Sequence, residues 1–135
     1  MDVGQNCATS LALPVTTTIA SGATIDVSAT DAGNGGTVAV WGNDKAEFAG
    51  TIDARGGAAG GDGGFVEVSS KGLLQFLGNV YAEAPHGKAG TVLLDPESIR
   101  IEAIGSNSPA ASVIAASALN GLLRQGLAVI LLADN

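Results

Sequence analysis

The residues with the clearest capacity for chemistry are two aspartates and an arginine. Asp26 and Asp53 close two copies of a Thr-Ile-Asp tripeptide, and Arg55 follows the second copy by two residues. Paired carboxylates carry out glycoside hydrolysis, and residues two apart in a strand share one face. One hypothesis is therefore a carbohydrate-processing cleft. The alternative, which we favour, is an exposed row of charges, because any repeat places like residues side by side. We expect no catalytic residues.

Four of the five aromatic side chains form two pairs. Phe48 and Phe76 are predicted to stack inside the fold. Trp41 and Tyr81 are predicted to face outward, where they could contact a ligand, since their rings combine an apolar body with a polar group. Two isolated aromatics suggest a carbohydrate-binding surface only weakly.

Metal, nucleotide and redox motifs are missing from the sequence. The single histidine, His86, lies in a predicted turn without a second ligand at metal-binding spacing. The glycine-rich segment before Phe65 offers only Asp62, too few oxygens for calcium. Cys7 is the only cysteine and is expected to be an unpaired thiol. No phosphate-binding loop is present. We therefore expect neither a metal nor a cofactor.

Charge and hydropathy restrict the possible partners. The formal net charge is −7, with six basic residues, so no basic stripe exists to bind nucleic acid. No apolar run reaches the ~18 residues that span a membrane as a helix. Residues 1–20 lack a charged segment before an apolar run, so no signal peptide is expected within them.

An internal repeat explains the spacing of the candidate residues. Segments 37–64 and 65–90 are two copies, residues 23–36 match the second half of an earlier copy, and residues 91–103 begin a third. The period is thus 28 and then 26 residues. Equivalent residues form files along the chain, for which we expect the sets Val38, Val66 and Val92; Val40, Val68 and Leu94; Ile25, Ile52 and Val80; Val27, Ala54 and Ala82; and Phe48, Phe76 and Ile101.

Apolar residues alternate with polar ones within each copy, which is typical of half-buried strands. Short strands separated by glycine-rich turns, repeating every 26–28 residues, predict the coils of a parallel β-helix, or β-solenoid. Successive coils would stack at about 4.8 Å, so that like side chains lie on like.

The C-terminal residues leave the repeat. Ser108 and Pro109 are a typical start for a helix, predicted over 110–125 and ended by Gly126. The following apolar run, 127–133, predicts a strand buried on both faces. We expect a single domain over 1–135, comprising a lead-in (1–18), repeat coils (19–103), a loop and short helix (104–126) and a final strand (127–135).

Three segments carry a family resemblance: GGTVAVW, the run TIDARGGAAGGDGGFVEVSSK, and HGKAGTVLLDPESIRI. With the later ASALNGLLRQGLAVILLADN, they resemble the large exoproteins of two-partner secretion, the filamentous-haemagglutinin-like adhesins. The resemblance covers roughly residues 20–135. It implies a right-handed β-helix, export through an outer-membrane partner transporter, and an extracellular or bacterial cell-surface location. The chain departs from that family in its length of 135 residues and in lacking the amino-terminal secretion domain.

The expected function is therefore structural rather than enzymatic: an adhesive shaft segment, with host-surface or matrix glycans or proteins as further partners. The alternative is a carbohydrate-binding or carbohydrate-active β-helix module. Exposed strand edges template further strands, so we also expect head-to-tail self-association into filaments. The expected association edge consists of Leu127, Val129, Ile130, Leu131 and Leu132.

Overall fold

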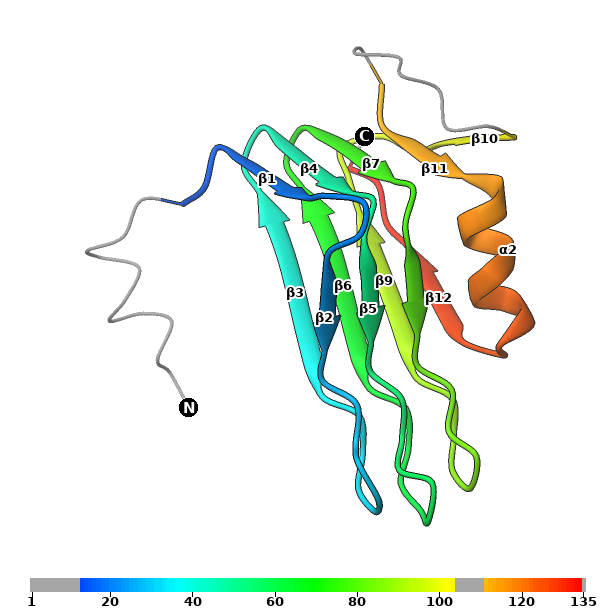
Figure 1. Ribbon diagram of the computed structural model, residues 1–135. Helices are drawn as coiled ribbons and strands as arrows, with labels where there is room; N and C mark the ends of the chain where they lie inside the picture. The colour runs from blue at the N-terminus through cyan, green and yellow to red at the C-terminus, as the bar shows by residue number, and fades with distance from the viewer. Residues whose placement is uncertain (1–12, 104–110, 135) are drawn as a thin grey trace.

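The alternating segments form strands of three to six residues in a computed structural model, which describes residues 13–103 and 111–134. The strands are β1 (Thr16–Ile19), β2 (Thr24–Asp26), β3 (Thr37–Gly42), β4 (Lys45–Phe48), β5 (Thr51–Asp53), β6 (Phe65–Ser70), β7 (Leu73–Phe76), β8 (Asn79–Tyr81), β9 (Thr91–Asp95), β10 (Arg100–Glu102), β11 (Val113–Ala115) and β12 (Ala128–Leu131). In Figure 1, β3, β6, β9 and β12 run side by side, and β1, β4, β7 and β11 lie across the top.

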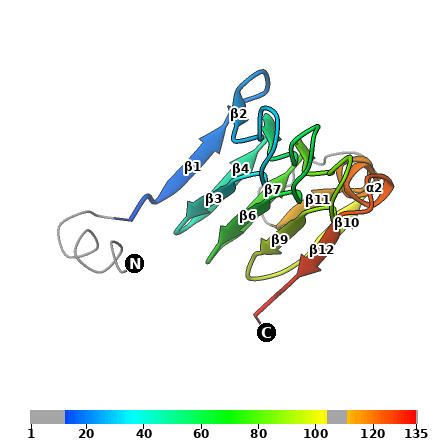
Figure 2. The ribbon, with the colours of Figure 1, turned by 90° about the horizontal axis from the view of Figure 1, so that it is seen from below.

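The strands form three parallel sheets. The five-stranded sheet has the order β1-β4-β7-β11-β10, the four-stranded sheet β12-β9-β6-β3 and the three-stranded sheet β2-β5-β8. The chain visits the sheets in a fixed sequence: β1, β2, β3, then β4, β5, β6, then β7, β8, β9. We call each such set of three a round. Figure 2 shows the successive rounds side by side. The predicted mostly-β character is confirmed: the described residues form parallel sheets with one short helix.

The register follows the repeat. Val38 pairs with Val66 and Val66 with Val92, while Ile25, Ile52 and Val80 are consecutive partners. The other predicted files hold as well, with one exception. Phe76 pairs with Ile114, and Ile101 is the partner of Ile114 one strand further out. Ile101 therefore lies on an edge strand and is 49% exposed.

Inward-facing side chains from the rounds make one core. Val66, Val68, Leu74 and their neighbours are fully buried. The rings of Phe48 and Phe76, both completely buried, stack with centroids 5.3 Å apart, as predicted. The core is thus a column of like side chains, built from small aliphatic residues with two aromatic rings.

Long glycine-rich loops join the three-stranded sheet to the four-stranded sheet, and they stack on one another at the foot of Figure 1. The N–H of Gly33 donates to the carbonyl of Gly60, and that of Gly63 donates to Lys88. A Cβ at Gly35 would overlap the carbonyl oxygen of Ala54, and one at Gly63 that of Ala82. Glycine is therefore needed here because neighbouring loops approach too closely for a side chain.

In the last round a helix replaces the middle strand. The chain runs from β11 through α2 (Ala116–Arg124) to β12, and α2 packs on β8 and β11. The predicted helix begins later than expected, because 113–115 form β11. Ser108 and Pro109, proposed as its start, lie outside the described residues, as does Cys7.

The final strand is also shorter and more open than predicted. β12 pairs with β9 through four residues. Only Val129 and Leu131 face the core, and they are half-buried, whereas Ile130 and Leu132 are 43% and 48% exposed. The expectation of a strand buried on both faces is wrong, because no layer of described residues covers the outer face of the four-stranded sheet. No helix in the described ranges is long and apolar enough to cross a membrane.

Candidate functional site

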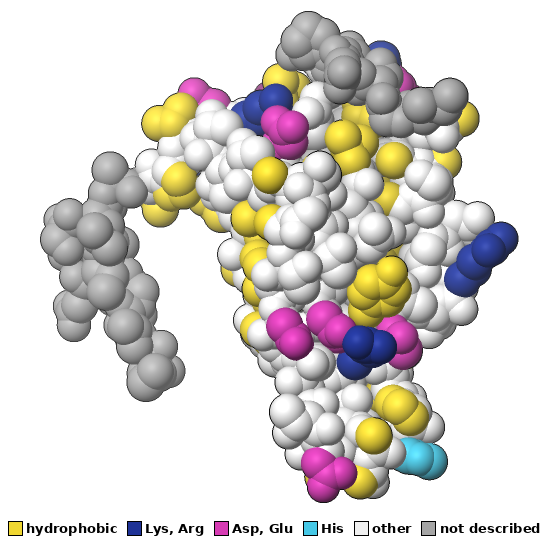
Figure 3. Space-filling model, viewed as in Figure 1, with side chains coloured by type: hydrophobic (Ala, Val, Ile, Leu, Met, Phe, Trp, Pro, Cys, Tyr) yellow, Lys and Arg dark blue, Asp and Glu magenta, His cyan; other side chains and the backbone are white. Residues whose placement is uncertain are grey.

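The first candidate surface is the outward file of Asp26, Asp53 and Tyr81. These residues end β2, β5 and β8 and are consecutive partners in the parallel register. The structure therefore brings the two aspartates together, as the repeat predicted, and adds Tyr81, which is 39% exposed. Acidic and basic side chains gather next to an apolar patch on this face in Figure 3.

Arg55 is held by this file rather than free above it. Its Nε donates to both carboxylate oxygens of Asp53, at 2.9 and 3.1 Å, and its second guanidinium nitrogen forms an ion pair with the same carboxylate. The guanidinium carbon also lies 5.9 Å from the centre of the Tyr81 ring. Hydrogen bonding to Asp53 raises the pKa of Arg55 above its already high usual value. Two of its N–H groups are therefore used within the protein.

Asp26 has a different partner. The hydroxyl and the backbone N–H of Ser28 donate to one of its oxygens at 2.6 and 2.9 Å. These bonds stabilise the carboxylate and lower the pKa of Asp26 below its usual value. Asp26 is thus held as an anion, without the raised pKa that a general acid requires.

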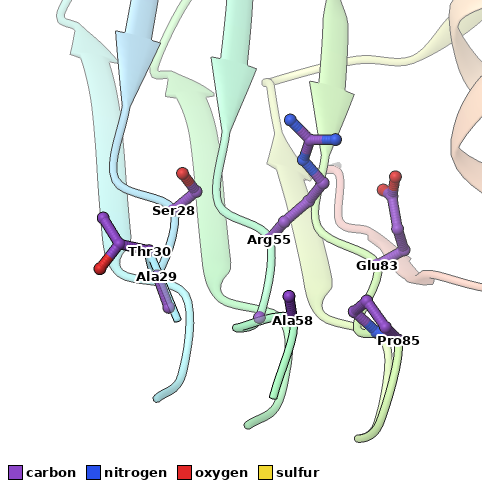
Figure 4. A pocket seen from close by; sticks show the side chains of 8 residues that line it. Ser28, Ala29, Thr30, Arg55, Ala58, Glu83 and Pro85 are labelled. Atoms are coloured by element: carbon purple, nitrogen blue, oxygen red, sulfur yellow. The ribbon is translucent and has the colours of Figure 1, made fainter. Parts of the chain in front are cut away.

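A hollow of about 260 Å³ lies beside this file. Ser28, Arg55 and Glu83 lie side by side on three successive segments, and Thr30, Ala58 and Pro85 follow them toward the loop ends (Figure 4). One Glu83 oxygen is buried without a hydrogen-bond partner in the described structure. This hollow was not predicted, because it depends on how far apart adjacent loops spread.

The second candidate surface surrounds Trp41. This tryptophan faces outward on β3, as predicted, and is half-buried. It borders a cavity of about 360 Å³, which we call the Trp41 hollow. The residues that line this cavity are Trp41, Ser70, Lys71, Asp95, Pro96, Glu97 and Asp134. Trp41 could be selected from its position in the repeat, but its neighbours could not, because they come from the three following rounds.

The remaining predicted residues are more widely spread. His86 is exposed in the turn after β8, and Asp62 accepts a hydrogen bond from the backbone of Lys88, which ties two loops together. Leu127 is buried in the core, while Val129, Ile130, Leu131 and Leu132 follow the outer edge of the four-stranded sheet. Within the described part of the chain, no group of histidine, cysteine or acidic residues could hold a metal ion.

Comparison with known proteins adds no assignment. No protein-family model matches the chain, and no curated protein matches it.

Proposed function

We propose that this chain is a segment of a right-handed parallel β-helix and serves as a structural, adhesive part of a secreted or cell-surface protein. The observation that carries this proposal is the unbroken register of equivalent residues, as in the file of Ile25, Ile52 and Val80. Stacked repeats of this kind form rigid, extendable shafts, because each repeat contacts only its neighbours. The resemblance to filamentous-haemagglutinin-like exoproteins supports the same function, together with export by an outer-membrane partner transporter.

Head-to-tail association is part of the proposal, and the strand edges indicate where it would occur. α2 covers the last strand of the three-stranded sheet. The outer strand of the five-stranded sheet, β10, carries Arg100 and Glu102, and charged edges oppose pairing. β12 has no charged residue and exposes Ile130. We therefore propose that β12 of one copy pairs with β3 of the next.

The test is sedimentation velocity with negative-stain electron microscopy across a concentration series. We expect larger species and short filaments as the concentration rises. Replacing Ile130 and Leu132 with lysine should abolish them, because charges on an edge strand repel a second strand. The matched control is Leu123→Lys on α2, at a side chain that is 56% exposed. A single monodisperse species at every concentration would contradict self-association.

Glycan binding without catalysis is a second candidate function. It is favoured by the two outward aromatics, Trp41 and Tyr81, each bordered by polar groups. Isothermal titration calorimetry with neutral, amino and acidic trisaccharides tests it. Heat of binding to at least one of them is expected, and no heat with any of them would contradict this function.

A further inference from the structure

The Trp41 hollow is lined by residues from four successive rounds. Trp41, Ser69 and Asp95 are consecutive partners on β3, β6 and β9, so they form one outward file. The backbone carbonyl of Trp41 accepts a hydrogen bond from the hydroxyl of Thr17 at 2.5 Å, which ties this end of β3 to β1. The tryptophan is therefore held in place before any ligand arrives.

The polar groups of the hollow are available to a ligand. In the described structure Lys71, Asp95 and Glu97 form no hydrogen bond or ion pair through their side chains, and neither does Asp134. The indole nitrogen of Trp41 has no hydrogen-bond partner among the described residues and is itself buried, so it is not one of the groups open to a ligand. On the other candidate surface, the guanidinium of Arg55 beside Tyr81 is already bound to Asp53.

The composition of the lining restricts the ligand. A volume of about 360 Å³ falls at the small end of sites for small molecules. An aromatic ring can pack against the C–H face of a sugar, while a lysine and several carboxylates can donate to and accept from its hydroxyls. Three carboxylates stand against one lysine, which disfavours an acidic sugar and favours an amine.

We infer that the Trp41 hollow is a saccharide-binding site that takes neutral or amine-bearing sugars and rejects uronic acids. This inference rests on the proposed glycan-binding function and names its site. The ring of Trp41 packs against the sugar. The carboxylates of Asp95 and Glu97 accept hydrogen bonds from the hydroxyl or ammonium groups of the sugar.

Trp41 is the only tryptophan in the chain, so its fluorescence reports directly on the hollow. We would titrate the full chain with cellotriose, with the glucosamine trisaccharide and with trigalacturonate. Saturable changes in emission are expected for the first two. The amine-bearing sugar should bind about two- to fivefold more tightly than cellotriose, as expected for an exposed ion pair. Tight binding of trigalacturonate at this site would overturn the charge argument.

Calorimetry on variants separates the site from the function. Trp41→Ala should weaken binding by about tenfold or more, and Glu97→Gln, at an exposed position, should weaken the glucosamine trisaccharide selectively. Leu123→Ala, at an exposed position on α2, is the control and should leave both affinities unchanged, whereas Tyr81→Ala tests the rival aromatic surface. If a sugar binds but Tyr81→Ala rather than Trp41→Ala removes it, the site is wrong and the function stands. If no sugar binds the unaltered chain, glycan binding itself is wrong.

Discussion

The first and last rounds of the stack end in different ways. In the first round the inward residues Ile19 and Ile25 remain partly exposed, although their counterparts in the next round, Phe48 and Ile52, are fully buried. In the last round α2 lies over β8, and its buried Leu122 extends the core. The described first round thus presents strand edges, whereas the last round presents a helix over one sheet.

A helix ends a sheet because its backbone N–H and C=O groups hydrogen-bond within the helix and do not pair with a further strand. The edge of β8 nevertheless needs partners. Gln125, just after α2, provides them: its Nε2 donates to the carbonyl of Val80 at 2.9 Å, and its Oε1 accepts from the N–H of Ala82 at 3.4 Å. One side-chain amide therefore supplies the donor and the acceptor that a neighbouring strand would have supplied.

The largest expected effect comes from matched truncations in one file. Ile52→Ala should lower the free energy of unfolding by about 2–5 kcal/mol, because its side chain is fully buried. Ile25→Ala, one round earlier, should cost about 1 kcal/mol or less, because part of that side chain already contacts solvent. Urea unfolding monitored by circular dichroism measures both. Equal losses would mean that the first round is as well covered as the second.

Replacing Gln125 tests the covered end. Gln125→Met keeps the length of the side chain but leaves the β8 edge groups unpaired, at a cost of about 1–3 kcal/mol in unfolding free energy. Arg124→Met, at the exposed end of the same helix, is the control and should change it by less than about 0.5 kcal/mol. A null result for Gln125→Met would show that packing of α2 alone ends the sheet.

One substitution inside α2 should stabilise the covered end of the stack against unfolding. Gly121 lies inside α2, and a Cβ there would meet nothing within 4 Å. Gly121→Ala should therefore raise the unfolding free energy by about 0.5–1 kcal/mol. Gly126→Ala should do the opposite, because Gly126 has a φ of +73° after the helix. The melting temperatures of the two variants should move in opposite directions.

The smallest effect concerns the charged file of the first round. Ser28→Ala removes the hydroxyl that is the main cause of the lowered Asp26 pKa, so this pKa should rise toward the usual value of about 3.9. Because the folded pKa is lowered, the stabilisation is present above the usual value and is lost as pH falls through the folded one. Carbon-detected NMR titration of the Asp26 carboxyl measures the change. An unmoved pKa would rule out Ser28 as its cause.

The repeat made most of the fold predictable. Alternation in segments such as 37–42 defined the strands, and equivalent spacing defined the partners, because a parallel stack pairs like with like. The prediction failed where the repeat fails. Residues 91–103 were expected to supply the strand that pairs with β7, but β11 pairs with it instead. Residues 113–115 were predicted to be helical because this apolar run leads directly into α2.

The candidate sites were predictable only in part. The outward direction of Trp41 and of Tyr81 follows from the alternation of inward and outward side chains along β3 and β8. The hollows do not, because they depend on turns from different rounds lying next to one another, as Lys71 and Glu97 do around Trp41. The function of Gln125 was equally hidden, since its partners on β8 lie 43 and 45 residues away in sequence.

The difference between the two ends can be measured at one file of amides. The N–H groups of Val27, Ala54 and Ala82 donate to Asp53, Tyr81 and the Gln125 side chain respectively. Residue-resolved hydrogen exchange, at a concentration where the chain sediments as a single copy, should show Ala54 and Ala82 exchanging only through global or near-global unfolding. Val27 should exchange at least about 100-fold faster through local opening of the first round. Exchange of Val27 as slow as that of Ala54, or exchange of Ala82 as fast as that of Val27, would contradict this account.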